Sequence, residues 1–172
     1  MLTSRHLPAY AFAGEEEGAE IMIGLGIRVK NAPDNLLYKI FSGISVSEYI
    51  WEISEEEIMY SENNEHKQKL FGNSILSGDE FLKCISRDSY YMIFANIKAY
   101  PIESNRTNIN TYKDYLESSC KIILLCADST FIDFYSKAPS ILKKVQENCI
   151  INHFEQVNIL TEENDTRTRM SV

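Results

Sequence analysis

Apolar and polar residues alternate along much of this chain with a period of two, which is the pattern of strands packed on a core. The first such segment carries Leu25, Ile27 and Val29 between polar or glycine positions. The segment 90–100 is instead apolar on both faces, as in a central strand, and Pro101 ends it. The same pattern predicts further strands over 49–53, 57–60, 121–127, 131–136 and 156–160.

Helical spacing of apolar residues interrupts these strands, and local signals mark where each helix begins. Pro33 opens the first helix and Pro139 opens the longest one, because proline is tolerated in the first turn. Ser77 lies three residues before a glutamate, which is the spacing of a capping box at the start of a short helix. Thr111 lies three residues before an aspartate and predicts one more helical turn, ending at Ser118.

The segments between these elements are of two kinds. Polar stretches without periodicity, over 61–74 and 102–110, are predicted loops. The short stretches 54–56 and 128–130 are predicted turns, and the second joins a β-hairpin. Because hairpins replace strict alternation of strands and helices, we expect a single α+β domain. Its sheet is largely antiparallel, with helices packed mainly on one face.

Length and charge bound the class of protein. The chain has 172 residues, which suits one domain that buries a core without disulfides. Its net charge of −8 disfavours binding to nucleic acid or anionic membrane, because such binding depends on clustered lysine and arginine. No apolar run approaches the roughly 20 residues of a transmembrane helix, and residues 1–20 lack a secretory signal. We therefore expect no nucleic-acid or membrane partner.

The four cysteines are Cys84, Cys120, Cys126 and Cys149, and none has C-x-x-C spacing. Three of them lie in apolar-periodic segments, which is typical of buried, reduced thiols. Structural zinc sites normally use paired short spacings, so we predict no metal, and nothing in the sequence indicates a cofactor. Reduced thiols and the lack of an export signal predict a cytoplasmic protein.

The start of the chain differs in composition from the rest. Residues 1–21 contain no lysine and no asparagine, whereas isoleucine, asparagine, lysine and tyrosine dominate from Met22 onward. Residues 14–18 would be encoded by purine-rich codons, much like a ribosome-binding site placed just before Met22. Two alternatives stand: residues 1–21 are an over-called start or a tag, or they are a short disordered extension. Either way we expect the domain to span 22–172, with a polar C-terminal tail over 161–172.

Three stretches make the chain resemble a known family: residues 90–101, the apolar hairpin ending at Ser136, and residues 163–172. The last stretch is the most specific, because little in core packing would dictate it. From about Gly26 to its end, the chain resembles short cytosolic proteins of spore-forming, low-GC bacteria that are known only as a domain of unknown function. The resemblance implies a domain of about 150 residues that starts near Met22. It implies no activity and no catalytic residue.

The common catalytic motifs are absent from the sequence, including the phosphate loop, the dinucleotide fingerprint and the zinc-protease and serine-hydrolase motifs. Asp128 and Asp133 flank the hairpin turn and could act as paired carboxylates, but turn and surface roles are the simpler interpretation. His153 could meet Cys126 or Cys149 as a base beside a nucleophile. A half-buried histidine that interacts with the dipole at a helix end is the simpler interpretation. We predict no catalytic residue.

The tail places Arg167 and Arg169 near Asp165 at the end of an acidic protein. If the tail is extended, both arginine side chains lie on one face, because side chains alternate. In a structural role, one arginine pairs with Asp165 or another surface carboxylate. In a binding role, both guanidiniums bind a phosphate or carboxylate, and Asp165 and Asp128 are candidate neighbours. A binding role predicts that replacing both arginines with alanine leaves the melting temperature within a few degrees.

Two functions from different classes fit these observations. The lack of a catalytic constellation, the acidic charge, the tyrosine-rich strands and the polar loops favour a non-enzymatic protein that binds another protein, for example as an antidote or accessory factor. The alternative is a small-anion-binding module or weak hydrolase centred on the C-terminal arginines. A flat aromatic patch without a pocket would favour the first function. A pocket lined by those arginines with Asp165 or Asp128 would favour the second.

Overall fold

The computed structural model describes residues 20–63 and 65–172. The predicted extension or false start over 1–21 therefore lies, except for its last two residues, outside the described residues. The elements in chain order are β1 (Met22–Arg28), α1 (Leu36–Phe41), the 3-10 turn η1 (Val46–Glu48), β2 (Tyr49–Tyr60), β3 (Gln68–Lys69), β4 (Ile75–Ser77), α2 (Gly78–Ile85), β5 (Tyr91–Pro101), α3 (Tyr112–Glu117), β6 (Ile122–Ala127), β7 (Phe131–Ser136), α4 (Pro139–Ile151) and β8 (Gln156–Thr161).

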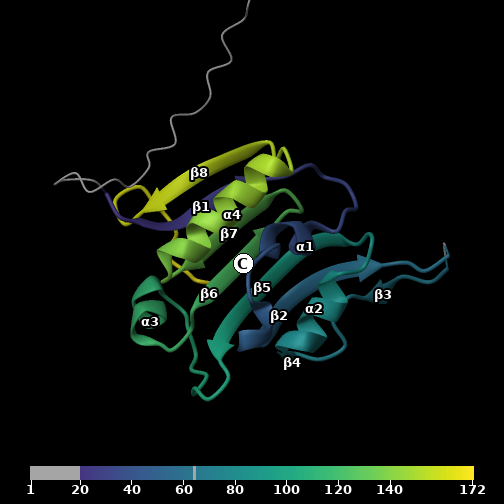
Figure 1. The fold of residues 1–172 in the computed structure, drawn as a ribbon, viewed down its shortest axis with the longest axis horizontal. Coiled ribbons are helices and arrows are strands. Elements are labelled where there is room, and N and C mark those ends of the chain that lie inside the picture. Colours follow the sequence, from purple (N-terminus) through teal and green to yellow (C-terminus); the bar gives the residue numbers. More distant parts are fainter. Residues whose placement is uncertain (1–19, 64) are drawn as a thin grey trace, which may run out of the picture.

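The eight strands of the described residues form one sheet, and every strand pairing among them is antiparallel. The strand order is β3-β2-β5-β6-β7-β1-β8, and β4 pairs with the other end of β2. Figure 1 shows the strands side by side, with α1, α2 and α4 crossing the sheet. The prediction of an α+β fold with a largely antiparallel sheet is confirmed.

The prediction of two strands over 49–53 and 57–60 was wrong, because a single strand, β2, runs through the supposed acidic turn. The register of β2 against β5 shifts between Ser54 and Glu57, and Glu55 has a positive φ of 47°. The extra residues bulge out of the ladder, and the strand continues beyond them, as a β-bulge allows. The long partner strand β5 pairs with both halves of β2, from Tyr49 to Met59.

The predicted loop over 61–74 also contains structure that the pattern did not reveal. The two residues of β3 pair with the end of β2, and the next two residues, Leu70 and Phe71, are buried. The backbone N–H of Leu70 donates to the carbonyl of Ile58 at 2.9 Å. A two-residue strand followed by two buried residues is too short to show a period.

The predicted helix starts are confirmed except at Pro33. Helix α1 begins only at Leu36, because Asp34 first forms an isolated antiparallel bridge with Tyr90. Ser77 and Thr111 each cap a helix through a complete capping box, at the starts of α2 and α3. Pro139 is the first residue of α4, and Gly43 follows α1 with a φ of 76°, a conformation that glycine adopts without strain. The turn over 128–130 joins β6 to β7 as expected.

The two faces of the sheet carry separate clusters of buried residues, because alternate residues of β6 face opposite ways. Ile122 and Leu124 belong to the larger cluster, whereas Ile123 and Leu125 belong to the smaller one. Helices α1, α2 and α4 contribute side chains to the larger cluster, so we call that side the first face. On the second face, Tyr115 of α3 joins the smaller cluster. No helix of the described residues is both long and apolar enough to cross a membrane.

Candidate functional site

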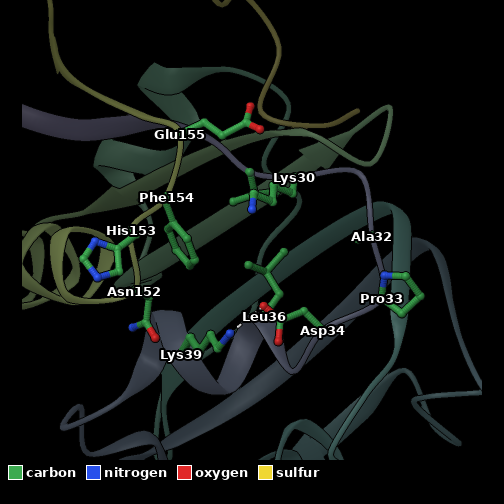
Figure 2. A pocket seen from close by; sticks show the side chains of 11 residues that line it. Lys30, Ala32, Pro33, Asp34, Leu36, Lys39, Asn152, His153, Phe154 and Glu155 are labelled. Atoms are coloured by element: carbon green, nitrogen blue, oxygen red, sulfur yellow. Dashed lines mark hydrogen bonds and ion pairs between the residues drawn. The ribbon is translucent and has the colours of Figure 1, made fainter.

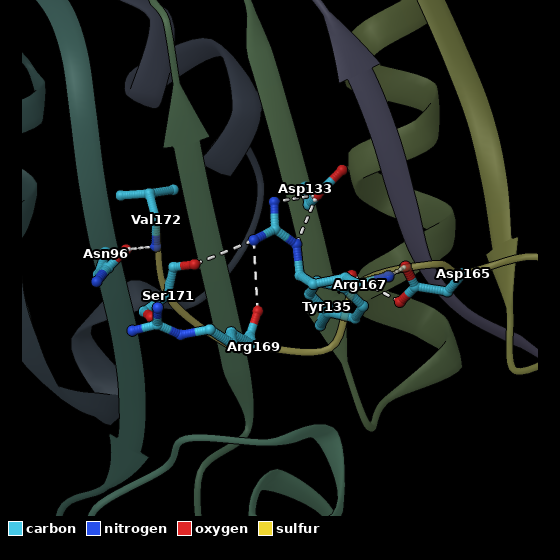
Figure 3. Close-up of polar contacts among 8 residues, drawn as sticks. All are labelled: Asn96, Asp133, Tyr135, Asp165, Arg167, Arg169, Ser171 and Val172. Atoms are coloured by element: carbon cyan, nitrogen blue, oxygen red, sulfur yellow. Dashed lines mark hydrogen bonds and ion pairs between the residues drawn. The ribbon is translucent and has the colours of Figure 1, made fainter.

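The predicted tail began at residue 161, but Thr161 is the last residue of β8, so the C-terminal tail is residues 162–172. This tail lies across the second face of the sheet (Figure 3). Met170 is only 1% exposed and belongs to the second-face cluster, and its N–H donates to the carbonyl of Asn110 at 2.9 Å. The N–H of Val172 donates to Oδ1 of Asn96 on β5 at 3.0 Å (Figure 3). The tail is therefore anchored at its end by a buried apolar side chain and by two hydrogen bonds.

Arg167 clamps the middle of the tail to β7. Its Nε and Nη2 both donate to Oδ2 of Asp133, at 2.9 and 2.6 Å. Its Nη1 donates to the backbone carbonyls of Arg169 and Ser171, at 3.4 and 3.1 Å. Most of the donors of this guanidinium thus have partners inside the protein, which fits the structural role rather than ligand binding.

Asp165 forms the second link between the tail and β7. The hydroxyl of Tyr135 donates to Oδ2 of Asp165 at 2.7 Å, and the N–H of Arg167 donates to Oδ1 at 3.0 Å. Burial raises the pKa of the Tyr135 hydroxyl, and its hydrogen bond to Asp165 adds to the rise. Tyr135 therefore stays protonated and acts as a donor that fixes Asp165.

A shallow polar hollow of about 480 Å³ opens beside these links. We call it the tail hollow. Its lining residues come from β7, β8 and the tail and are Asp133, Leu160, Asn164, Asp165, Thr166, Arg167, Thr168, Arg169 and Ser171. Arg169 is exposed, and its guanidinium makes no hydrogen bond or ion pair within the described residues. In Figure 3 its side chain points away from Asp133. The tail hollow therefore has one guanidinium available to a ligand.

The structure brings together three of the four candidate binding residues, Arg167, Arg169 and Asp165, and separates the fourth. Asp128 lies in the β6–β7 turn with a φ of 51° and does not line the tail hollow. The carboxylate that binds Arg167 is instead Asp133, whose outward position follows from strand alternation. Its pairing with Arg167, 34 residues away, has no local sequence signal.

The second face also carries two exposed phenylalanines, one on each side of a half-buried alanine. Phe131 on β7 is 53% exposed and pairs in register with Ala127 on β6. Phe94 on β5 is 37% exposed. Its neighbour Ala95 pairs with Cys126, so Phe94 lies beside Ala127 on the antiparallel strand β6. The guanidinium of Arg28 lies 5.5 Å from the centre of the Phe131 ring. We call Phe94, Ala127 and Phe131 the aromatic row.

Comparison with known proteins places the chain in a family. A family model described as a protein of unknown function (DUF2691) matches residues 22–171. The chain belongs to the DUF2691 family. An uncharacterized protein of Bacillus subtilis (strain 168), YncE, is 31% identical over 150 residues, which are 87% of this chain and 98% of that relative. No solved structure matches the chain. The predicted membership of a family of unknown function is confirmed.

The cysteine–histidine alternatives do not come together in this DUF2691 protein. His153 follows α4 and is exposed rather than half-buried, and its ring makes no hydrogen bond among the residues described. Burial raises the pKa of both candidate thiols, Cys126 and Cys149, to about 12. A thiol held in its protonated form is a poor nucleophile. Within the described ranges, no group of three or more histidine, cysteine or acidic side chains is arranged to hold a metal ion.

Proposed function

We propose that this DUF2691 protein is a cytoplasmic, non-enzymatic binding module that holds a partner protein on the second face of its sheet. The partner chemistry that fits is an apolar segment carrying a carboxylate. The observation that carries the proposal is the position of Arg169, an available guanidinium that lines the tail hollow on the same face of the sheet as the aromatic row.

The aromatic row supports a polypeptide as the ligand. Single exposed apolar residues are normal on protein surfaces, but Phe94 and Phe131 flank Ala127 on three adjacent strands. Val172, at the end of the tail, is 36% exposed and is bound to Asn96 on the same strand as Phe94. An apolar segment laid along this row would cover exposed aromatic rings, which commonly contribute to binding between proteins.

The tail hollow supports an acidic group on that segment. Asp133 lies two residues from Phe131 on the same strand, so the hollow adjoins the aromatic row. Arg167 is already neutralised by Asp133, which leaves Arg169 to bind a carboxylate through both of its terminal nitrogens.

The alternative function, a small-anion-binding module, is supported by the tail hollow alone. A free phosphate there would meet the Asp133 and Asp165 carboxylates as well as Arg169, and it would gain nothing from the aromatic row. A carboxylate on an apolar segment uses both features. We therefore favour the protein partner.

The test is quantitative affinity capture with matched baits, followed by binding of the purified partner measured by calorimetry. Phe131→Lys and Arg169→Glu change the proposed surface. Ile151→Lys and Lys143→Glu make the same kinds of change at exposed positions of α4, on the first face. We expect the partner to bind the wild type and both controls equally, and to bind each surface variant at least about tenfold more weakly.

Equal binding of the partner to Phe131→Lys and the wild type would refute the protein-binding proposal. A parallel nuclear magnetic resonance titration with inorganic phosphate and with acetate examines the alternative. One outcome would favour an anion-binding module instead. In it, the tail amides show saturable shifts that vanish in Arg169→Glu but persist in Phe131→Lys, and affinity capture finds no partner of the kind described.

A further inference from the structure

A second concave site lies where the end of α4 meets the start of α1. This groove has a volume of about 310 Å³ and is formed by the β1–α1 connection and the α4–β8 connection (Figure 2). The two connections are more than a hundred residues apart in the chain, and no sequence motif related them to each other. The groove shares no lining residue with the tail hollow.

The floor of the groove is apolar. Leu36, the first residue of α1, is 8% exposed, and Phe154 is half-buried against the first-face cluster. Figure 2 shows both side chains between the charged residues that surround them. A concave site with an apolar floor and a few polar groups at its rim is the usual form of a small-molecule site.

The rim of the groove has one lysine, Lys30, that none of the carboxylates in its lining pairs with. Lys39 forms a 2.6 Å ion pair with Asp34. The carboxylate of Glu155 lies 3.7 Å from the guanidinium of Arg28, a residue that does not line the groove. The ammonium group of Lys30 has no ion pair or hydrogen bond within the part of the chain that the structure describes. Because Arg28 pairs with Glu155 from outside the groove, Lys30 is the cation left for a ligand at this rim.

His153 is held at the rim by an unusual backbone conformation. The N–H of His153 donates to the carbonyl of Ile150 at 3.1 Å, and the N–H of Phe154 donates to that of Cys149 at 3.0 Å. These two bonds form a Schellman motif in which His153 occupies the left-handed position with a φ of 54°. Glycine is the residue that this position prefers, so the imidazole is kept here at a conformational cost.

We propose that this groove binds a small organic anion with an apolar body, such as an aromatic carboxylate or phosphate ester. The apolar body lies on Leu36 and Phe154, and the anionic group lies between the ammonium of Lys30 and the imidazole of His153. This site is independent of the protein-binding surface proposed above, because the two share no residue.

The experiment is a titration of the isotope-labelled protein, followed by the backbone amide signals of residues 30–36 and 152–155. The probes are benzoate, phenyl phosphate, inorganic phosphate and the neutral benzyl alcohol, each taken to about 10 mM, well above a millimolar dissociation constant. We expect benzoate or phenyl phosphate to give saturable shifts, and the stronger of the two identifies carboxylate or phosphate as the preferred group. Inorganic phosphate lacks the apolar body and benzyl alcohol lacks the anionic group, so both should bind more weakly.

The variants Lys30→Ala and His153→Gly should each weaken binding of the preferred probe roughly tenfold, whereas Lys143→Ala on the exposed side of α4 should not. His153→Gly should unfold at the same temperature as the wild type or higher, because glycine relieves the left-handed strain. Benzyl alcohol binding as tightly as the anions, wild-type affinity in Lys30→Ala and His153→Gly, or no saturable shift with any probe would each overturn the proposal.

Discussion

The clamp between Arg167 and Asp133 gives the sharpest prediction about how the tail is held. Arg167→Ala removes two charge-assisted hydrogen bonds to Asp133 and two hydrogen bonds to tail carbonyls. The two side chains are 23% and 28% exposed, so the pair is neither fully buried nor freely solvated. The loss of unfolding free energy should therefore fall between the values that are typical of exposed and of buried ion pairs.

Exposed ion pairs contribute about 0–1 kcal/mol. Removing one partner of a buried pair costs about 3–5 kcal/mol, largely because the other charge is left without a partner. For this half-buried pair we expect the free energy of unfolding to fall by about 2 kcal/mol, which is within the range of hydrogen bonds to charged groups. In a domain of this length, that loss lowers the melting temperature by about 4–8 °C.

Urea unfolding followed by tryptophan fluorescence measures this change directly. Trp51 is the only tryptophan in the chain and is fully buried, with its ring stacked on Phe81 at 3.8 Å. Asp133→Ala and the double variant complete a thermodynamic cycle, in which we expect a coupling energy of about 1–2 kcal/mol. Arg169→Ala is the control and should stay within about 0.5 kcal/mol of the wild type. A wild-type urea midpoint for Arg167→Ala, or no coupling with Asp133, would show that the clamp does not hold the tail.

Three further predictions concern buried groups. Met170→Ala should cost about 3 kcal/mol of unfolding free energy, measured in urea, and should speed hydrogen exchange of the tail amides, because the side chain is 1% exposed. Asn148→Leu should cost about 2 kcal/mol in the same assay, since its side-chain amide donates to two carbonyls at the end of α1, at 2.9 and 2.8 Å. Burial raises the pKa of Cys126 and Cys149 to about 12, so the unfolded chain loses these protons first. Their contribution to stability is complete below about pH 8.5 and is lost as the pH rises toward 12, and a flat urea midpoint between pH 8 and 11 would contradict this.

The features that sequence reasoning predicted well are those with local causes. The capping residues Ser77 and Thr111 satisfy backbone groups three residues away, so the same short spacing specifies the helix start in any context. The hairpin around 128–130 likewise depends on two adjacent apolar runs and the turn between them. Strand β5, apolar on both sides, could only be central.

The features that it missed depend on partners far away in the chain. The acidic residues 54–56 favour a turn by composition, but β5 is long enough to pair with the chain on both sides of them, so they form a bulge. Burial of Leu70 and Phe71 depends on β2 and α2 already being in place. The groove joins residues of two connections that no periodicity relates, and the sequence suggested cysteine partners or a helix dipole for His153 rather than the β1–α1 connection.

The arrangement of the tail also changes how its two arginines must be tested. A variant that replaces Arg167 and Arg169 together combines the loss of a clamp with the loss of an exposed guanidinium, so a fall in melting temperature would not exclude a binding role for Arg169. Anchoring of the tail uses Arg167, Asp165 and Met170, and leaves the Arg169 side chain out of every hydrogen bond and ion pair within residues 20–63 and 65–172. Because Arg169 contributes little to anchoring, its replacement alone reports on binding. A stable Arg169→Glu protein that loses its partner would therefore assign the arginine a function that the double variant cannot reveal.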